Sequence, residues 1–335
     1  MAPLRFVQSP GTFTVEEIPL FPPCGHGSHA YLTVRRAGSS TPFLLGEIRR
    51  RLRLAEEDLG CAGMKDRDAV AVQTFSIPSR LRAQAELAFG ELGCEVLSSA
   101  LHTHKLRTGK LAGNRFTVRV EGAEPTDGET LEADLRRIEA EGMPNAFGPQ
   151  RFADRSGLEE GRKIFLGHRP SGPFRRARFL VSAFQALLFN DWLEARRSRG
   201  LLPWPVPGDV MKRHDSGGEF PAEEVDETLL ARVRSLEISP AGPLFGGKMA
   251  RASKEALQFE EETLARHGLT VRDVASARAP GARRPMRVPV GRVEFVWTDG
   301  GAVLSFTLPP GSYASVLLGE AGIEIVPPPR REGAA

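Results

Sequence analysis

The chain has 335 residues and a net charge of only +3, so overall charge does not draw it to polyanions, although a locally basic face is compatible with its 45 Lys and Arg. Its hydrophobic content of 41% is ordinary, and the absence of any run of 18 apolar residues argues against a membrane span. The start lacks a signal peptide's apolar segment, and three cysteines without paired spacing indicate reduced thiols, so we expect a cytoplasmic protein.

The chain is predicted to begin with two strands, over 12–20 and 29–36, joined by a Pro- and Gly-rich turn. That turn contains Cys24, His26 and His29, whose C-x-H-x-x-H spacing invites comparison with zinc sites. No further ligand pair has the spacing to complete such a site, and we expect no metal.

A helix is predicted over 43–58, and it leads into Gly60–Gln73, which reads GCAGMKDRDAVAVQ. The small residues before the charges predict a bend that a ligand can approach closely, and the alternation after them predicts a strand. Asp66 stands between Lys65 and Arg67, which we expect to lower the pKa of its carboxyl. An ionised, rigidly held carboxylate suits nucleophilic catalysis, while a surface loop with three neighbouring charges is the alternative.

A basic stretch without any acid follows a predicted helix over 80–92 and a strand over 95–102. This stretch, 102–116, is broken by two glycines and leads into a strand over 116–120. It is suited to contacting phosphates, although a solvated basic loop has the same composition. Its candidate RNA-binding residues are His104, Lys105, Arg107, Lys110, Asn114 and Arg115.

An acidic helix over 129–142 precedes the polar turn 144–157, PNAFGPQRFADRSG. Phe147 is flanked by small residues there, and an aromatic ring in such a turn can stack on a base removed from its helix. A core phenylalanine that anchors the loop is the alternative. The candidate substrate-binding residues are Lys65, Arg67, Asn145, Phe147, Gln150 and Arg151.

The composition changes at about residue 156, where we place a second domain over 156–282. A basic stretch over 162–178, interrupted by Pro and Gly, precedes helices predicted over 179–197 and 254–267. Ser182 is a candidate cap for the first of these helices. The residues 240–247 are predicted to form a tight turn, and 278–284 a basic linker. The candidate RNA-binding residues here and just beyond are Arg175, Arg176, Arg283 and Arg284.

The chain is predicted to return to strands over 286–297 and 302–308, joined by a turn, and then to end in a turn that opens a helix over 308–320. Strands at both ends with a helical segment between them predict an α+β fold. We therefore expect one domain formed by 1–155 and 283–335, split by the insertion.

Several ordered motifs together resemble one family, the TruD-type tRNA pseudouridine synthases. The motifs are FTVEEIPLF (13–21), AGMKDRDAVAVQ (62–73), HKLRTGKLAGNRF (104–116), PNAFGPQRF (144–152), SAFQALLFN (182–190), GARRP (281–285) and LPPGSYAS (308–315). The resemblance implies an antiparallel pseudouridine synthase sheet flanked by helices, an insertion domain, and RNA bound between the two. It also implies a tRNA substrate, modified at uridine 13 of the D-arm, no cofactor, and no obligatory protein partner for a monomeric enzyme.

Within that family the Asp of AGxKD is the nucleophile, which falls on Asp66, and the motif around Phe147 and Asn145 holds the target base. The sequence also departs from the family pattern. Val7 stands where a basic residue is usual, with Arg5 nearby, and this leaves open which cation pairs with Asp66. The other departures are Ser28, Ala71, Ala146, Ala153 and Gly319.

The chemistry is consistent with these residues. Pseudouridine formation is an isomerisation, and the sequence has no Walker loop or dinucleotide motif. Flipping the uridine out of its helix costs roughly a few kcal/mol of free energy, and stacking on Phe147 offsets part of this cost. Asp66 then promotes cleavage of the N1–C1′ bond, either by attacking the sugar or by acting as a base toward a glycal. Two other classes remain open: an RNA-binding module without catalysis, and a hydrolase that pairs Asp66 with His102 or His104.

Overall fold

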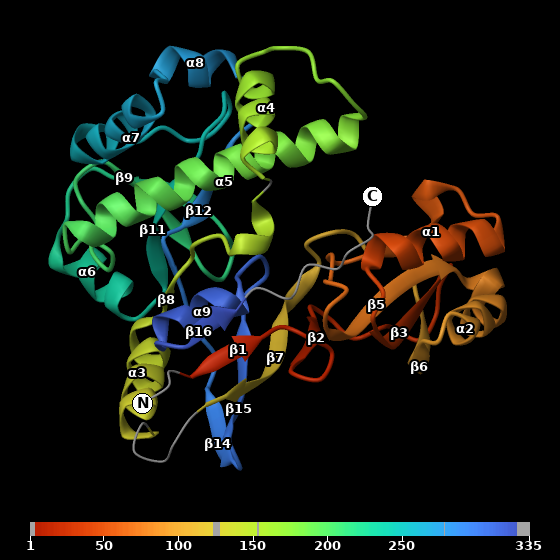
Figure 1. Ribbon diagram of the computed structural model, residues 1–335. Coiled ribbons are helices and arrows are strands. Elements are labelled where there is room, and N and C mark those ends of the chain that lie inside the picture. The colour runs from red at the N-terminus through yellow and green to blue at the C-terminus, as the bar shows by residue number, and fades with distance from the viewer. Residues whose placement is uncertain (1–3, 123–127, 153, 278, 327–335) are drawn as a thin grey trace. The chain divides into compact units, whose positions relative to one another are not determined.

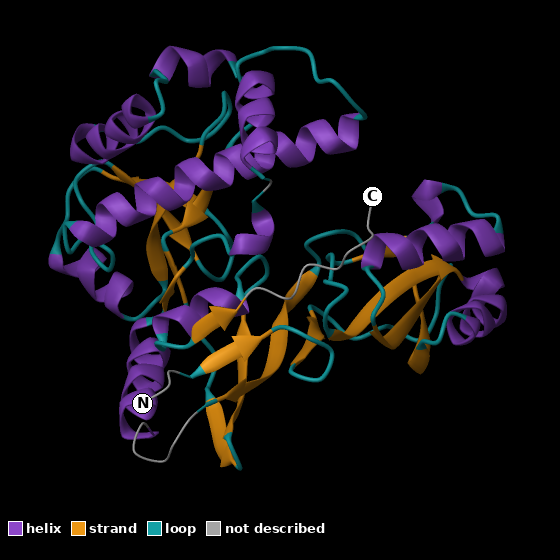
Figure 2. Cartoon of the chain, in the orientation of Figure 1, coloured by secondary structure: helices purple, strands orange, loops and turns teal. Residues whose placement is uncertain are grey.

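The computed structural model describes residues 4–122, 128–152, 154–277 and 279–326, and the chain forms two compact units (Figure 1). The first unit comprises Met1–Arg136, Val290–Ala314 and Leu318–Ala335, and the second comprises Arg137–Pro289 and Ser315–Leu317. Each unit contains both helices and strands (Figure 2), so the predicted α+β class is confirmed.

The first unit is built on one ten-stranded sheet. Its strands are β1 (Arg5–Val7), β2 (Phe13–Pro19), β3 (His29–Ala37), β4 (Gly60–Cys61), β5 (Val70–Pro78), β6 (Glu95–His102), β7 (Leu111–Glu121), β14 (Glu294–Thr298), β15 (Gly301–Leu308) and β16 (Glu324–Val326). The main path is β14-β15-β7-β2-β5-β3-β6, while β1 pairs with β16 and β7, and β4 pairs with β5.

This sheet is mostly antiparallel, as predicted, and contains two parallel pairs. The pairs β1–β16 and β2–β5 are parallel, and the other pairs are antiparallel. Parallel neighbours need a crossover connection, and the chain between β2 and β5 provides one because it contains β3 and the helix α1 (Thr41–Leu52).

Helices α1 and α2 (Arg82–Glu91) cover one face of β3 and β5 (Figure 1), where Leu32, Leu44 and Phe75 are among the buried core residues. The side chain of Ser40 accepts a hydrogen bond from the Phe43 amide and caps α1. The helix ends at Leu52, because the next residue, Arg53, adopts a left-handed conformation with φ 52°. The predicted extension to residue 58 is therefore wrong, and Glu56–Asp58 form a short 3₁₀ helix.

The second unit packs helices against a four-stranded antiparallel sheet with the order β10-β9-β11-β12. Its strands are β9 (Asp209–Arg213), β10 (Glu219–Ala222), β11 (Ile238–Leu244) and β12 (Ala282–Pro285), with β8 (Met143–Pro144) paired to β13 (Arg287–Val288). Its helices are α4 (Arg155–Phe165), α5 (Phe174–Ser198), α6 (Glu227–Arg234), α7 (Lys254–Arg266) and α8 (Val271–Ser276). Two more helices, α3 (Gly128–Glu141) and α9 (Ala314–Glu320), include residues of both units.

Three predictions for residues 240–297 are wrong, and contacts with a helix or a neighbouring strand explain two of them. The predicted tight turn 240–247 is mostly the strand β11, in which a Cβ on Gly242 would stand 2.3 Å from the ring of Trp192. The glycine therefore serves close packing of α5 on the strand. The predicted linker 278–284 ends in β12, which pairs with β11. The predicted strand 286–297 is divided into β13 and β14.

Helix α5 begins at Phe174, five residues before the predicted start, with Pro173 as its N-cap. Proline is tolerated at the start of a helix, where its missing N–H leaves no hydrogen bond unmade. Because the helix begins this early, Arg175, Arg176 and Arg178 lie on it. Ser182 lies inside α5 and is no cap, because its hydroxyl accepts a hydrogen bond from Arg151.

The residues 137–155 and 283–289, expected in the split domain, lie in the second compact unit. Assignment of 1–155 and 283–335 to a catalytic domain, with 156–282 as its insertion, stays a proposal.

Candidate active site

The loop that carries Asp66 lies between β4 and β5, and buried side chains hold its main chain in place. The Thr41 hydroxyl accepts from the Lys65 amide at 2.8 Å. Arg36, which is 2% exposed, donates to the carbonyl of Lys65 at 3.1 Å and to that of Asp66 at 3.4 Å. The loop conformation is therefore fixed by contacts from β3 and α1 rather than by its own sequence.

Lys65 points into the protein, so the contact with substrate predicted for it is wrong. Its Nζ lies 3.1 Å from Oε1 of Glu17 and donates to Oδ1 of Asn114 at 2.7 Å, and the Lys65 and Glu17 side chains are 7% and 4% exposed. Glu17 also accepts from the Thr74 amide at 3.0 Å. Asn114 is buried as well, so the predicted RNA contact of Asn114 is also wrong. Both residues instead support the Asp66 loop.

Asp66 is an exposed residue, yet protein atoms crowd its carboxyl. This partial exclusion of water raises the pKa of Asp66, and it outweighs the lowering by a hydrogen bond from Gln8 and by the charges of Arg36 and Lys65. The predicted net lowering by flanking cations is wrong, because the loss of hydration outweighs the charge of Lys65. Arg67, the other flanking cation, donates to the carbonyl of Gly38 at 3.2 Å. A carboxyl that is reachable and poorly solvated is typical of a reactive group.

The glycine at the start of this stretch has a structural purpose. A Cβ on Gly60 would stand 2.2 Å from the carbonyl oxygen of Leu106 and 2.6 Å from the Ser76 hydroxyl. The close approach predicted for a ligand is thus made by the protein's own chain at this position.

The basic stretch 102–116 is divided between structural and exposed residues. His102 is 9% exposed and packs against Tyr31, with 4.7 Å between ring centroids. Lys105 donates its Nζ to the carbonyl of Glu57. The strand β7 begins at Leu111, five residues before its predicted start. Exposed cations and histidine remain at His104, Arg107, Lys110 and Arg115.

Phe147 lies in the second unit and is half-buried. Asn190 of α5 holds its main chain through two hydrogen bonds, accepting from the Phe147 amide at 2.8 Å and donating to its carbonyl at 3.0 Å. The ring meets Phe189 edge-on at 5.6 Å between centroids. Phe147 therefore belongs partly to the core, as the anchoring alternative expects, while part of its surface stays accessible.

Arg284 and Asn145 lie next to that ring. The Arg284 guanidinium carbon stands 4.1 Å from the Phe147 ring centroid, and its Nε and Nη2 donate to the carbonyl and Oδ1 of Asn145 at 2.7 and 2.6 Å. Asn145 is 3% exposed, and its amide nitrogen donates to the carbonyl of Pro285 at 3.1 Å. The structure thus brings three residues of two separate motifs together.

The other candidate residues of the second unit differ in their surroundings. Arg151 lies 5.9 Å from the Phe147 ring centroid and donates to Ser182, and Gln150 is exposed. Arg175 and Arg176 are exposed on the first turn of α5. The contact with RNA predicted for Arg283 is wrong, because this side chain is 3% exposed and forms a buried ion pair with Glu260.

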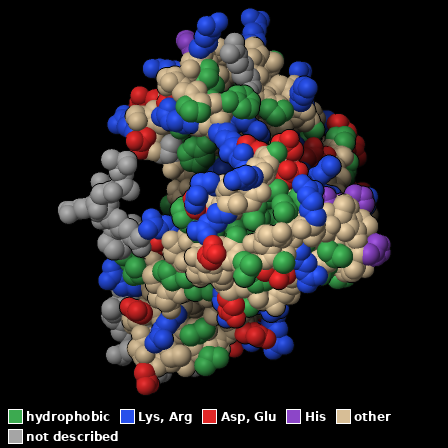
Figure 3. Space-filling view, turned by 90° about the vertical axis from the view of Figure 1, so that its right-hand side faces the viewer, with side chains coloured by type: hydrophobic (Ala, Val, Ile, Leu, Met, Phe, Trp, Pro, Cys, Tyr) green, Lys and Arg blue, Asp and Glu red, His purple; other side chains and the backbone are tan. Residues whose placement is uncertain are grey.

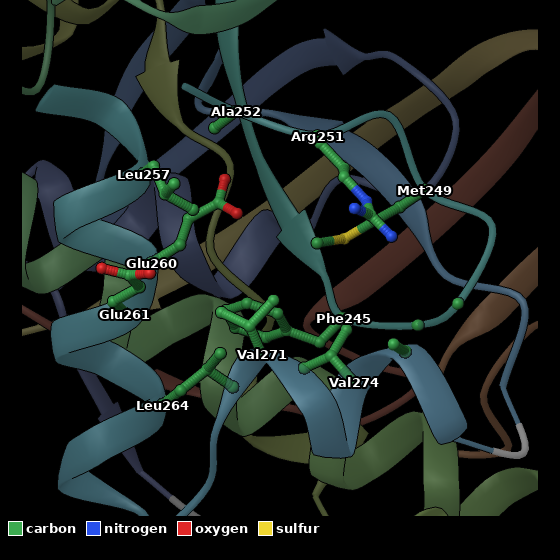
Figure 4. A pocket seen from close by; sticks show the side chains of 13 residues that line it. Phe245, Met249, Arg251, Ala252, Leu257, Glu260, Glu261, Leu264, Val271 and Val274 are labelled. Atoms are coloured by element: carbon green, nitrogen blue, oxygen red, sulfur yellow. The ribbon is translucent and has the colours of Figure 1, made fainter. Parts of the chain in front are cut away.

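The second unit also contains a cavity of about 210 Å³ that is lined mainly by apolar side chains. Figure 4 shows Leu257 and Leu264 of α7 facing Val271 and Val274 of α8 around it, with Arg251 on the opposite side. None of the substrate- or RNA-binding residues predicted from the sequence lines this cavity.

On the face drawn in Figure 3, Lys and Arg side chains lie among apolar and acidic ones. Within residues 4–122, 128–152, 154–277 and 279–326, no three His, Cys, Asp or Glu side chains gather as metal ligands would. No helix in these ranges has the length and apolarity needed to cross a bilayer.

Comparison with known proteins decides the family. The model of the family described as tRNA pseudouridine synthase D (TruD) matches residues 4–164 and 173–321. The chain belongs to the TruD family of tRNA pseudouridine synthases. It is 42% identical over 313 residues to a tRNA pseudouridine synthase D of Thermus thermophilus, covering 93% of this chain and 86% of that protein. The Anaeromyxobacter sp. Fw109-5 protein of the same name is 40% identical over 333 residues, covering 95% and 93%.

A solved structure supports the TruD fold. The crystal structure named tRNA pseudouridine synthase D (TruD) from Methanosarcina mazei superposes with a TM-score of 0.68 at 22% identity, covering 96% of this chain and 93% of that one. At this identity the likeness concerns the fold.

Sequence reasoning missed three residues that position the TruD-family motifs here: Glu17, Arg36 and Asn190. Glu17 and Asn190 fall inside quoted motifs, FTVEEIPLF and SAFQALLFN, where a polar residue among apolar neighbours was an available signal. Arg36 ends a predicted strand and has no such signal, because its burial depends on Thr41 and the Asp66 loop.

Proposed function

We propose that this chain isomerises uridine to pseudouridine in tRNA, at uridine 13 of the D-arm, with Asp66 as the nucleophile and without a cofactor. The observation that carries the proposal is the state of Asp66: an exposed residue whose poorly solvated carboxyl has a raised pKa, on a main chain held by hydrogen bonds with Arg36 and Thr41. Family membership gives the reaction, and this geometry supports the choice of residue.

The reaction needs only rearrangement of bonds within the substrate. Asp66 promotes cleavage of the N1–C1′ bond, by adding to the sugar or by removing a proton toward a glycal, and the freed uracil stays bound. The uracil rotates and its C5 bonds to C1′, while the bond from Asp66 to C1′ breaks in the first route or C2′ regains its proton in the second. A base takes the C5 proton and N1 gains one, so that product and substrate have the same atoms. A carboxylate poorly solvated by water and held in one place reacts faster than a mobile, hydrated one.

Phe147 and Asn145 are proposed to hold the target uridine. An aromatic ring stacks on a base that has left its helix. The hydrogen bonds from Asn190 and the contact with Arg284 support this proposal, since they fix the position of the Phe147 ring before substrate arrives. Gln150, Arg151 and Arg67 stay candidate polar contacts.

The exposed cations are proposed to bind tRNA phosphates with an affinity that falls as salt rises. They are Arg107, Lys110, Arg115, Arg175 and Arg176, and the exposed imidazole of His104 is proposed as a further contact with the RNA. We further propose a monomer that acts in the cytoplasm without an obligatory protein partner.

The hydrolase alternative needs a histidine paired with Asp66, and the described contacts do not favour it. His102 packs against Tyr31, and His104 exchanges a 2.8 Å hydrogen bond with Thr103. No comparable observation supports that reaction.

The test is to incubate the purified protein with an unmodified tRNA transcript and no additive, and to map pseudouridine by carbodiimide adduct and reverse transcription. We expect one new pseudouridine, at position 13. Absence of any pseudouridine, or its formation at other positions alone, would overturn the proposal.

A further inference from the structure

A second concave site lies in the first unit, on the face of the large sheet opposite α1 and α2. It has a volume of about 310 Å³. Its floor is a row of hydroxyls, because Thr74, Thr33 and Ser98 are register neighbours on β5, β3 and β6. The hydroxyl oxygens of Thr33 and Thr74 lie 3.3 Å apart. Hydroxyls both donate and accept, so this row can bind either kind of polar edge.

The walls of this hydroxyl-floored site are apolar. Leu20 and Phe21, from the chain after β2, are 52% and 39% exposed, and Leu106 and Leu111 line the site as well. Exposed apolar side chains that border a cavity are typical of binding sites. Phe21 is nevertheless held, because its ring stacks on His102 with 5.2 Å between centroids and 20° between planes. A fixed aromatic ring loses little freedom when a ligand stacks on it.

Positive charge borders the same site. Lys110 lines it and is exposed, and Arg107 lies exposed in the same acid-free segment. The acidic residue in the lining is Glu17, whose carboxylate faces Lys65 and accepts from the Thr74 amide. An anionic ligand is therefore favoured at Lys110, next to the apolar walls.

We propose that this cavity takes one unpaired base of the tRNA, stacked against Phe21, with its edge on the Thr33 and Thr74 hydroxyls and its phosphate at Lys110. The inference rests on tRNA as the substrate and assigns a site separate from the uridine that reacts. The volume is at the lower end of ligand pockets, which span about 300–1,000 Å³, and it thus suits a single base. Apolar walls with a few polar groups beside a cation are what a splayed nucleotide needs.

The first experiment measures the dissociation constant of unmodified tRNA for Phe21→Ala at several salt concentrations. Loss of a stacked base typically weakens affinity by about fivefold or more, so we expect the dissociation constant of Phe21→Ala to rise by at least that factor. The salt slope, which is the slope of log affinity against log salt concentration, should stay unchanged. Leu87→Ala is the control, since Leu87 is 70% exposed on α2 and borders no part of the site. Equal affinities of Phe21→Ala, Leu87→Ala and the unchanged protein would overturn the proposal.

Two further variants keep the proposal testable if circular dichroism shows that Phe21→Ala does not fold. Thr33→Val keeps the volume and removes one hydroxyl, and we expect weaker tRNA binding with the salt slope kept. Lys110→Gln should reduce the salt slope by about one. Unchanged binding by Thr33→Val and an unchanged slope for Lys110→Gln would contradict the assignment.

A photo-crosslinking amino acid at position 21 identifies the occupant. We expect a crosslink to one unpaired nucleotide of tRNA, also when Asp66→Ala is combined with it. Crosslinks only within paired stems, or only to another protein, would overturn the inference. Because these measurements concern binding, they stand apart from the activity assay: loss of the proposed reaction at Asp66 would leave them unaffected.

Discussion

The guanidinium of Arg284 lies 4.1 Å from the centre of the Phe147 ring and also donates two hydrogen bonds to Asn145. One side chain from β12 thus contacts both residues that are proposed to hold the target base. The sequence predicts an RNA-binding role for Arg284, whereas its contacts favour a positioning role within the second unit. The planar guanidinium is suited to this, since it stacks on a ring and presents paired donors at its edge.

Replacing Arg284 by Lys is expected to lower turnover and leave tRNA binding intact. The charge is kept, but the flat stacking surface and the paired donors are lost. A small displacement of a positioned group costs up to about 100-fold in rate, so we expect kcat to fall by about 10- to 100-fold. The dissociation constant of tRNA and its salt slope should change by less than about twofold, as for a contact that does not involve phosphate.

The matched control is Arg272→Lys, an exposed arginine on α8 outside every proposed contact, which should keep full kcat. A phosphate-binding role for Arg284 predicts the reverse pattern, with kcat kept in Arg284→Lys and a smaller salt slope in Arg284→Gln. That pattern would remove the positioning role.

The buried pair of Lys65 and Glu17 is expected to stabilise the first unit. Replacing Lys65 by Met leaves the Glu17 carboxylate buried without its cation, which typically costs about 3–5 kcal/mol of unfolding free energy. Urea denaturation measures this loss. The double variant Lys65→Met with Glu17→Gln should recover part of it, since no uncompensated charge remains. A loss below about 1 kcal/mol in the single variant would show that the pair contributes little.

The raised pKa of Asp66 predicts how turnover depends on pH. The reactive anion is lost as the pH falls through that raised pKa, so kcat should decline at a higher pH than an ordinary aspartate, with a pKa of about 3.9, would cause. A pH–rate profile under single-turnover conditions measures it. A rate that stays constant down to about pH 4 would contradict the raised pKa.

The same shift predicts a gain in stability when the charge is removed. Because the folded state raises the pKa of Asp66, its ionised form destabilises the fold above the folded pKa, and this cost vanishes below the unfolded pKa. Asp66→Asn should therefore have a higher Tm than the unchanged protein at pH 7, with a difference that shrinks as the pH falls. A lower Tm for Asp66→Asn at pH 7 would mean that neighbouring groups stabilise the anion.

The three cysteines are expected to react at different rates. Burial raises the pKa of Cys61 to about 11 and also raises that of Cys94, whereas a main-chain hydrogen bond at His26 lowers the pKa of the exposed Cys24. Because the thiolate is the reactive form, a thiol reagent at neutral pH should modify Cys24 first. Cys24→Ser should remove the fast phase. A fast phase that persists in Cys24→Ser would contradict the burial of the other two.

Much of the first unit could be predicted because its elements carry local signals. The strand over 95–102 has the predicted bounds, and the TDGG turn joins the predicted hairpin. The second unit was harder, since packing decides its strands. Gly242 and the prolines beside it read as a turn, but the ring of Trp192 fills the space that a side chain would need.

In the candidate site, too, local sequence signals predicted some features, while packing decided others. Motifs predicted Asp66, Phe147 and Asn145 as site residues, and these assignments stay proposals. Motifs could not show which way a cation points: Lys65 faces Glu17, and Arg283 faces Glu260. Nor could they show that crowding around the Asp66 carboxyl outweighs the charges beside it in sequence. Direction and crowding both depend on distant parts of the chain.

The central claim is that the Asp66 carboxylate carries out the reaction. The most direct measurement is single-turnover formation of pseudouridine by Asp66→Ala and Asp66→Asn at saturating tRNA, with tRNA affinity measured on the same preparations. We predict a loss of at least about 1,000-fold in rate, as for other catalytic nucleophiles, with affinity kept within about threefold. Turnover by folded Asp66→Ala at a rate near that of the unchanged protein would contradict the account.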